Sequence, residues 1–200
     1  MLFHVSEDGR IAHFQPRPSE YTTEPVVWAI EESRLCNYLV PRDCPRVTYY
    51  AGPQTTKSDI EKFLTATSVV VAVESAWLER IRSCRLYVYS MPATTFESLD
   101  ECAGYFVSRV PVVPTRVHVV DDVIAELLRR GVELRFVPDL TQLGHVVVQS
   151  TLLFSLIRMR HAAKSKDRAC RLAGLANPRE RGFLARWRRH FQPRNIDEER

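Results

Sequence analysis

The chain has 200 residues, of which 45% are hydrophobic and 26% charged, as is typical of one soluble globular domain with a sizeable core. No apolar run approaches the ~20 residues of a membrane-spanning helix, and the start MLFHVSEDGR lacks the basic and apolar regions of a signal peptide, so we expect no membrane partner. The five cysteines are odd in number and have no metal-ligand spacing, which predicts free thiols, no bound metal and a cytoplasmic location.

The net charge of +4 is unevenly distributed along the chain. Residues 158–194 hold twelve Lys or Arg against two Asp or Glu and carry +10, whereas residues 1–157 carry −4. A basic segment after a mildly acidic one is typical of proteins that contact nucleic acid or a membrane surface. We therefore predict a single α+β domain over residues 1–162 and a basic, helical or partly disordered tail over residues 163–200.

The first half of the domain predicts short strands separated by short helices. Runs rich in β-branched or alternating apolar residues predict strands, and acids or a capping residue before an apolar spacing predict helices. Ser58 with Glu61 fits a capping box. In chain order we expect strands over residues 2–6, 26–30, 47–50, 68–74 and 85–89, and helices over residues 31–39, 58–65 and 77–81.

The second half of the domain predicts further strands and one long helix. Asp121 and Asp122 begin a helix that Gly131 ends, and Asp139 caps a long helix over about residues 140–163, whose apolar middle should be buried against the sheets. About eight strands that do not alternate strictly with helices indicate an α+β fold of two packed, mostly antiparallel sheets with flanking helices. The strands of this half are expected over residues 104–108, 116–119 and 132–137.

The first strand carries a polar pair in an apolar run. Because side chains alternate along a strand, His4 and Ser6 share one face, and Phe3 and Val5 share the other. Two hydrogen-bonding groups side by side indicate a polar cleft. The alternative is that His4 is a half-buried histidine with a satisfied hydrogen bond.

The segment over residues 41–46, PRDCPR, places two arginines, a carboxylate and a thiol between prolines that restrict the backbone. Arginine suits bidentate binding of phosphate or carboxylate, so Arg42 and Arg46 are candidate ligand-binding residues. The alternative is an internal ion pair of these arginines with Asp43 that fixes the loop. Cys44 is either an inert thiol or a nucleophile whose pKa the arginines lower.

Two carboxylates compete for a catalytic role. Glu133 lies in an otherwise apolar strand, where it shares a face with Arg135, so it either pairs with an arginine or projects into a cleft. Glu74 ends the most apolar strand. Ser155 and Arg158 fall near one face of the predicted long helix, where the arginine would pair with a buried carboxylate.

Several motifs, in chain order, resemble a family of small microbial proteins of uncharacterised function. The resemblance covers about residues 2–162 and supplies no activity, and the tail lies outside it. Its motifs are LFHVSEDGRIAHFQPR, VVWAI, PRDCPRVTYY, AGYFVS, GVELRFVPDL and STLLFSLIRMR.

A more distant similarity is to the ADP-ribosyltransferase-like superfamily. It rests on LFH in the first strand, Ile11 and Phe14 after it, VVWAI followed by Tyr38, the strand LYVY, and Glu133 in VEL. The resemblance implies that His4 holds a ribose hydroxyl of NAD, that Tyr38 packs on nicotinamide, and that Glu133 steadies an oxocarbenium-like transition state. The PRDCPR segment has no counterpart in the superfamily pattern.

The sequence therefore leaves two functions. The first is an enzyme that acts on NAD or another nucleotide-like anion in a central cleft, with His4, Tyr38 and Glu133 as catalytic residues. The second is a non-catalytic module that binds a small anion or nucleic acid through the arginines and the basic tail. The expected ligand-binding residues are Ser6, Arg17, Trp28, Arg42, Asp43, Arg46 and Arg158.

Overall fold

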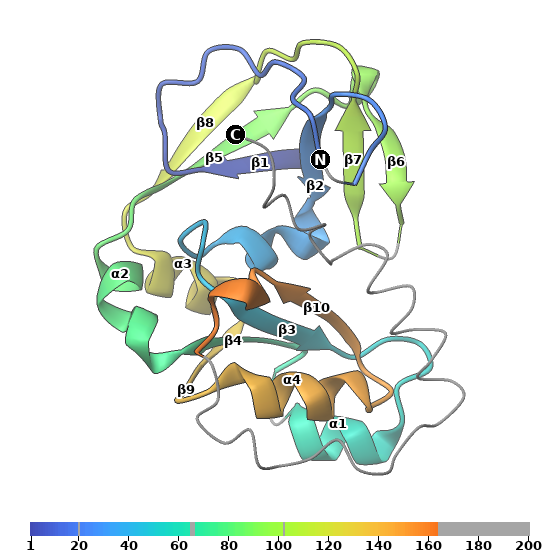
Figure 1. The fold of residues 1–200 in the computed structure, drawn as a ribbon, viewed down its shortest axis with the longest axis vertical. Helices are drawn as coiled ribbons and strands as arrows, with labels where there is room; N and C mark the ends of the chain where they lie inside the picture. The colour runs from blue at the N-terminus through green and yellow to red at the C-terminus, as the bar shows by residue number, and fades with distance from the viewer. Residues whose placement is uncertain (20, 65–66, 102, 164–200) are drawn as a thin grey trace, which may run out of the picture.

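The computed structural model of the protein describes residues 1–19, 21–64, 67–101 and 103–163 (Figure 1). Its strands form a six-stranded and a four-stranded sheet, and every strand pair is antiparallel except one. The predicted α+β class with two mostly antiparallel sheets and a few helices is therefore confirmed.

The six-stranded sheet is built around the N-terminal strand. β1 (Leu2–Ser6) pairs with β5 (Leu86–Met91) along its whole length, but with β2 (Val27–Glu31) only at Leu2 and Phe3. The sheet is completed by β6 (Glu97–Asp100), β7 (Tyr105–Ser108) and β8 (Arg116–Val120), in the order β6-β7-β2-β1-β5-β8.

The four-stranded sheet lies below the first sheet in Figure 1. Its strands are β3 (Arg46–Tyr50), β4 (Val69–Glu74), β9 (Glu133–Val137) and β10 (Leu153–Ile157), in the order β10-β3-β4-β9, with β4 and β9 parallel.

The described helices are short. The α-helices are α1 (Lys57–Phe63), α2 (Leu78–Arg82), α3 (Val123–Arg129) and α4 (Leu140–Val148). The 3-10 helices are η1 (Glu32–Tyr38), η2 (Ser75–Trp77), η3 (Ala93–Thr95) and η4 (Met159–His161). None of the helices in these described ranges is long and apolar enough to cross a membrane.

The largest core cluster joins the two sheets. Phe3 of β1 packs in it with Val71 and Val73 of β4, together with buried residues of η1, α2 and α3. The alternate residues of β4, Val70 and Ala72, belong to a second cluster with α1 and α4. β4 is thus buried on both faces, as its β-branched sequence predicts.

The predicted long helix over residues 140–163 is wrong. α4 ends at Val148, and the hydroxyl of Ser150 donates to the carbonyl of Val147 (2.7 Å) where the chain turns. The following apolar run forms β10, which pairs along its whole length with β3. An apolar run fits a buried helix or a buried strand equally well, and here pairing with β3 supplies backbone partners for the strand.

Two smaller differences between the predicted and the observed elements concern α1 and β6. The N-cap of α1 is Thr56 rather than Ser58, because the Thr56 side chain accepts a hydrogen bond from the amide of Asp59 (3.3 Å). β6 was not predicted, since its four residues are all exposed and carry no apolar alternation. The predicted caps of α3 are confirmed by Asp122 at its start and by Gly131 after its end, where φ is 72°.

Candidate functional site

His4 lies where β1 and β2 cease to pair. Its Nδ1 is 2.9 Å from the carbonyl oxygen of Trp28. Since a carbonyl oxygen only accepts, Nδ1 carries the proton and donates it. Burial lowers the pKa of His4 more than this hydrogen bond raises it, so the ring is neutral at neutral pH. The Nδ1 atom is therefore satisfied, and Nε2, without a hydrogen-bond partner among the described residues, is an acceptor.

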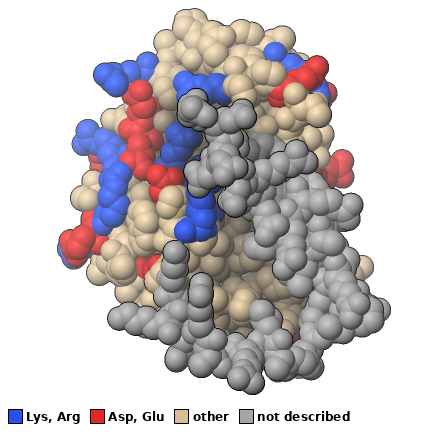
Figure 2. Space-filling model, viewed as in Figure 1, with Lys and Arg blue, Asp and Glu red and all other residues tan. Residues whose placement is uncertain are grey.

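Two exposed arginines act on His4. Besides burial, the charges of Arg42 and Arg17 both act to lower the pKa of the histidine. Neither guanidinium forms an ion pair with a carboxylate of the described residues. Other exposed arginines do have acidic partners, and Figure 2 shows blue and red side chains side by side on one flank. These paired arginines include Arg80 with Glu7, Arg85 with Asp121, and Arg109 with Glu24 and Glu97.

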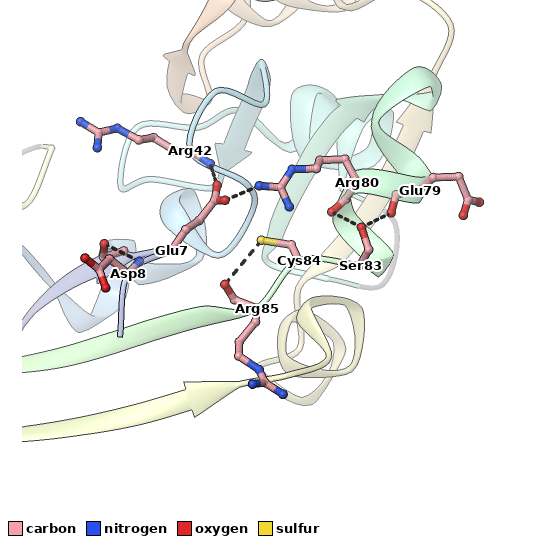
Figure 3. Close-up of polar contacts among 9 residues, drawn as sticks. Glu7, Asp8, Arg42, Glu79, Arg80, Ser83, Cys84 and Arg85 are labelled. Carbon is pink, nitrogen blue, oxygen red and sulfur yellow. Dashed lines mark hydrogen bonds and ion pairs between the residues drawn. The ribbon is translucent and has the colours of Figure 1, made fainter. Parts of the chain in front are cut away.

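The backbone of Arg42 is fixed, whereas its side chain is not paired. The carboxylate of Glu7 accepts a hydrogen bond from the Arg42 amide (2.9 Å) and forms an ion pair with Arg80. The Arg42 side chain extends away from both of these residues (Figure 3). An arginine held by its backbone, with its guanidinium directed elsewhere, is suited to bind an anion.

Aromatic side chains connect Trp28 to η1. The Trp28 ring lies edge-to-face with Tyr21 and with Tyr105, at centroid distances of 6.3 and 5.9 Å. The Tyr38 hydroxyl donates to the Tyr105 hydroxyl (3.0 Å). The His4 ring instead packs against Phe14 (4.7 Å between centroids) and lies opposite Tyr89, on the other face of the sheet. The structure therefore brings His4 to the Trp28 backbone but does not bring it together with Tyr38.

Arg46 is buried rather than exposed, with 2% of its surface accessible. Its Nε donates to the carbonyl of Asn37 (2.8 Å), and its Nη1 donates to the carbonyls of Cys44 (2.8 Å) and Arg42 (3.3 Å). Burial lowers its pKa to about 10, so the guanidinium still carries its charge at neutral pH.

Asp43 does not pair within its own loop. Its Oδ1 lies 3.8 Å from the Nε of Arg158 and 3.8 Å from the Nε2 of His161, both beyond β10. The alternative of an ion pair with Arg42 or Arg46 is therefore wrong. The Asp43 side chain is exposed and reaches a segment far away in the sequence instead.

Two predicted site residues have partners elsewhere. The Ser6 hydroxyl accepts from the amide of Asp8 (3.0 Å) in the turn after β1. Glu133 pairs with Arg135 through an Nη2–Oε1 contact of 2.6 Å. In the register of β4 and β9, Glu133 lies opposite Val70, which belongs to the core cluster under α1 and α4. Since opposite residues share a face, Glu133 points away from the six-stranded sheet.

The competing carboxylate, Glu74, is 3% exposed and accepts hydrogen bonds from the backbone amides of Leu140 (3.4 Å) and Ala163 (2.9 Å). It therefore stabilises the start of α4. The arrangement places neither Glu74 nor Glu133 among the residues around Tyr38.

Cys44 is fully buried, and burial raises the pKa of its thiol to about 12, against a smaller opposite effect of Arg46. The thiol is therefore protonated at neutral pH, which favours the alternative of an inert thiol over that of a nucleophile. Over the described ranges, no group of three or more His, Cys, Asp or Glu residues is placed to hold a metal ion.

Sequence reasoning missed two members of this region. Tyr105 carries no sequence signal of a site, because its hydroxyl contact with Tyr38 joins two elements far apart in the chain. Asn37 is 1% exposed, and its Nδ2 donates to the Ser155 hydroxyl (3.4 Å). The sequence signal that could have found Asn37 is its position, a polar residue directly before Tyr38. Of the predicted basic tail, residues 164–200 lie outside the described residues.

Comparison with known proteins gives one match. A model for a family of unknown function (DUF6886) matches residues 3–162. No curated protein and no solved structure matches the chain.

Proposed function

We propose that this chain, which belongs to the DUF6886 family of unknown function, binds a nucleotide-like anion through His4 and the arginines around it. The observation that carries the proposal is the hydrogen bond from His4 Nδ1 to Trp28, because it leaves a neutral ring with Nε2 as acceptor. The charges of Arg17 and Arg42 both act to lower the pKa of this ring. One region thus offers an acceptor for a sugar hydroxyl and two cations for phosphate groups.

The ligand class follows from this combination. Guanidinium groups bind phosphate oxygens in bidentate fashion, and a neutral imidazole nitrogen accepts from a hydroxyl. NAD and ADP-ribose carry both kinds of group, and a fold of the ADP-ribosyltransferase-like kind is part of the proposal.

The positions of the carboxylates favour ligand binding without catalysis over group transfer. Cleaving the glycosidic bond of NAD calls for an anion beside the oxocarbenium-like transition state. Glu133, to which the resemblance assigns that role, pairs with Arg135 on the outer face of the four-stranded sheet. A nucleic-acid function through the tail stays a prediction, since the tail lies outside the described residues.

Titration calorimetry with ADP-ribose and with NAD tests the proposal. We expect the wild-type chain to bind at least one of them. Arg42→Ala should weaken binding by about tenfold or more, since a hydrogen bond to a charged group contributes about 1.5–3 kcal/mol, and His4→Ala severalfold, since a hydrogen bond between neutral groups contributes about 0.5–1.5 kcal/mol. Arg85→Ala is the matched control, because Arg85 is an exposed arginine paired with Asp121. The proposal would be overturned if the wild-type chain bound neither ligand, or if His4→Ala and Arg42→Ala both bound with wild-type affinity.

A further inference from the structure

A buried cation without a carboxylate partner sets Arg46 apart. Its Nε and Nη1 atoms are occupied by backbone carbonyls, which hold the guanidinium in place. Within the part of the chain that the structure describes, its Nη2 has no hydrogen-bond acceptor and its charge has no acidic partner. By contrast, the buried carboxylate of Glu126 has two counter-charges, because Arg129 and Arg130 both pair with it. A buried charge is costly unless a counter-charge compensates it.

A second cation lies near Arg46. Ile157, the residue before Arg158, lies opposite Arg46 in the register of β10 and β3, and the charge of Arg158 acts to lower the pKa values of both Arg46 and Tyr38. Its carboxylate contact is to Asp43 at 3.8 Å, and the Asp43 side chain is 57% exposed, so water screens this pair. The backbone of Arg158 has a φ of 56°, a left-handed conformation unusual for a residue other than glycine. Such conformations concentrate at ligand sites, where the surroundings compensate for them.

A hydroxyl donor completes the group. The Tyr38 hydroxyl donates a hydrogen bond to the Tyr105 hydroxyl, so the Tyr105 hydroxyl can donate one to another acceptor. The pKa of Tyr105 is raised by burial, so the hydroxyl keeps its proton. The Tyr38 ring lies against Arg46, with 5.4 Å between the guanidinium carbon and the ring centroid.

We propose that Arg46, Arg158 and Tyr105 form a second anion subsite that binds one phosphate group. Two guanidinium groups balance the two negative charges of a phosphate, and the tyrosine donates a further hydrogen bond to its oxygen. This subsite uses side chains other than His4, Arg17 and Arg42, so it can fail while the proposed function holds.

Calorimetry with inorganic phosphate on the full chain, at matched ionic strength in chloride, tests the subsite. We expect wild-type protein and the control Arg85→Ala to bind phosphate alike. Arg158→Gln should weaken binding about tenfold and Tyr105→Phe severalfold, as the loss of a charged and a neutral donor predicts. Arg42→Ala tells the two sites apart, because the Arg42 guanidinium belongs to the site proposed around His4, whereas only the Arg42 backbone contacts Arg46.

Two results would overturn the subsite. One is no phosphate binding by the wild-type chain, or wild-type affinity in both Arg158→Gln and Tyr105→Phe. The other is loss of phosphate binding in Arg42→Ala alone, which would place the phosphate beside His4 and leave the proposed function intact. The test avoids substitution of Arg46, because Arg46 holds the carbonyls of η1 and the loop and its variants are prone to misfold.

Discussion

The guanidinium of Arg46 packs against the ring of Tyr38, and its Nε binds the carbonyl of the preceding residue, Asn37. This relationship joins the end of η1 to the start of β3. The PRDCPR segment therefore offers its carbonyl groups to Arg46, while the Arg42 side chain extends away from Glu7 and Arg80 (Figure 3). Two arginines of one short motif thus differ, since Arg46 is buried and fixes the region whereas Arg42 is exposed.

The lowered pKa of His4 predicts a pH dependence of stability. The unfolded chain binds a proton at this residue with an ordinary pKa near 6.5, whereas the folded chain does so only at lower pH. The unfolded state therefore holds more protons in this window, so the free energy of unfolding falls as the pH drops below 6.5 and is unaffected by this group above it.

Urea denaturation at a series of pH values measures this effect in wild-type protein and in His4→Gln, whose amide keeps a donor for the Trp28 carbonyl but does not titrate. We expect a flatter pH dependence in His4→Gln. His118→Gln, at an exposed position on β8, is the control and should follow the wild type. Equal slopes for His4→Gln and wild type would contradict the assignment.

Glu133→Gln separates binding from transfer. Because Glu133 pairs with Arg135 on a face away from His4, we expect the affinity for ADP-ribose to stay within about twofold of wild type. Calorimetry gives the affinity, and release of nicotinamide from NAD measures any turnover. A tenfold loss of affinity, or turnover that this variant abolishes, would show that Glu133 acts at the ligand, as the superfamily resemblance implies.

Two fully buried tyrosines should respond oppositely to loss of the hydroxyl. Tyr89 donates to the Asp8 carbonyl (2.7 Å) and accepts from the Ile11 amide (3.2 Å), so Tyr89→Phe should cost about 1–3 kcal/mol of unfolding free energy. The Tyr49 hydroxyl has no hydrogen-bond partner among the described residues. Tyr49→Phe should be neutral or stabilising by up to about 1 kcal/mol. Urea denaturation of both variants checks this, and a larger loss in Tyr49→Phe than in Tyr89→Phe would contradict it.

Local patterns predicted most elements but not their long-range contacts. The helix of α3 follows from Asp122 and Gly131, and the burial of β4 follows from its composition. The strand β10 did not follow, because its apolar run is compatible with a helix until β3 is known to lie beside it.

The candidate site shows the same limit. Alternation correctly placed Glu133 on one face with Arg135, and the ion pair between them was one of the two alternatives. Which face turns toward the other sheet depends on the packing of α1 and α4. The contact of Asp43 with Arg158 likewise depends on β10 pairing with β3, which carries Arg158 toward the PRDCPR segment.

A crystal structure of the chain with ADP-ribose tests the central claim most directly. The account predicts a ribose hydroxyl within hydrogen-bonding distance of His4 Nε2 and phosphate groups beside Arg17 and Arg42. A ligand bound at another surface, with His4 out of contact, would contradict it.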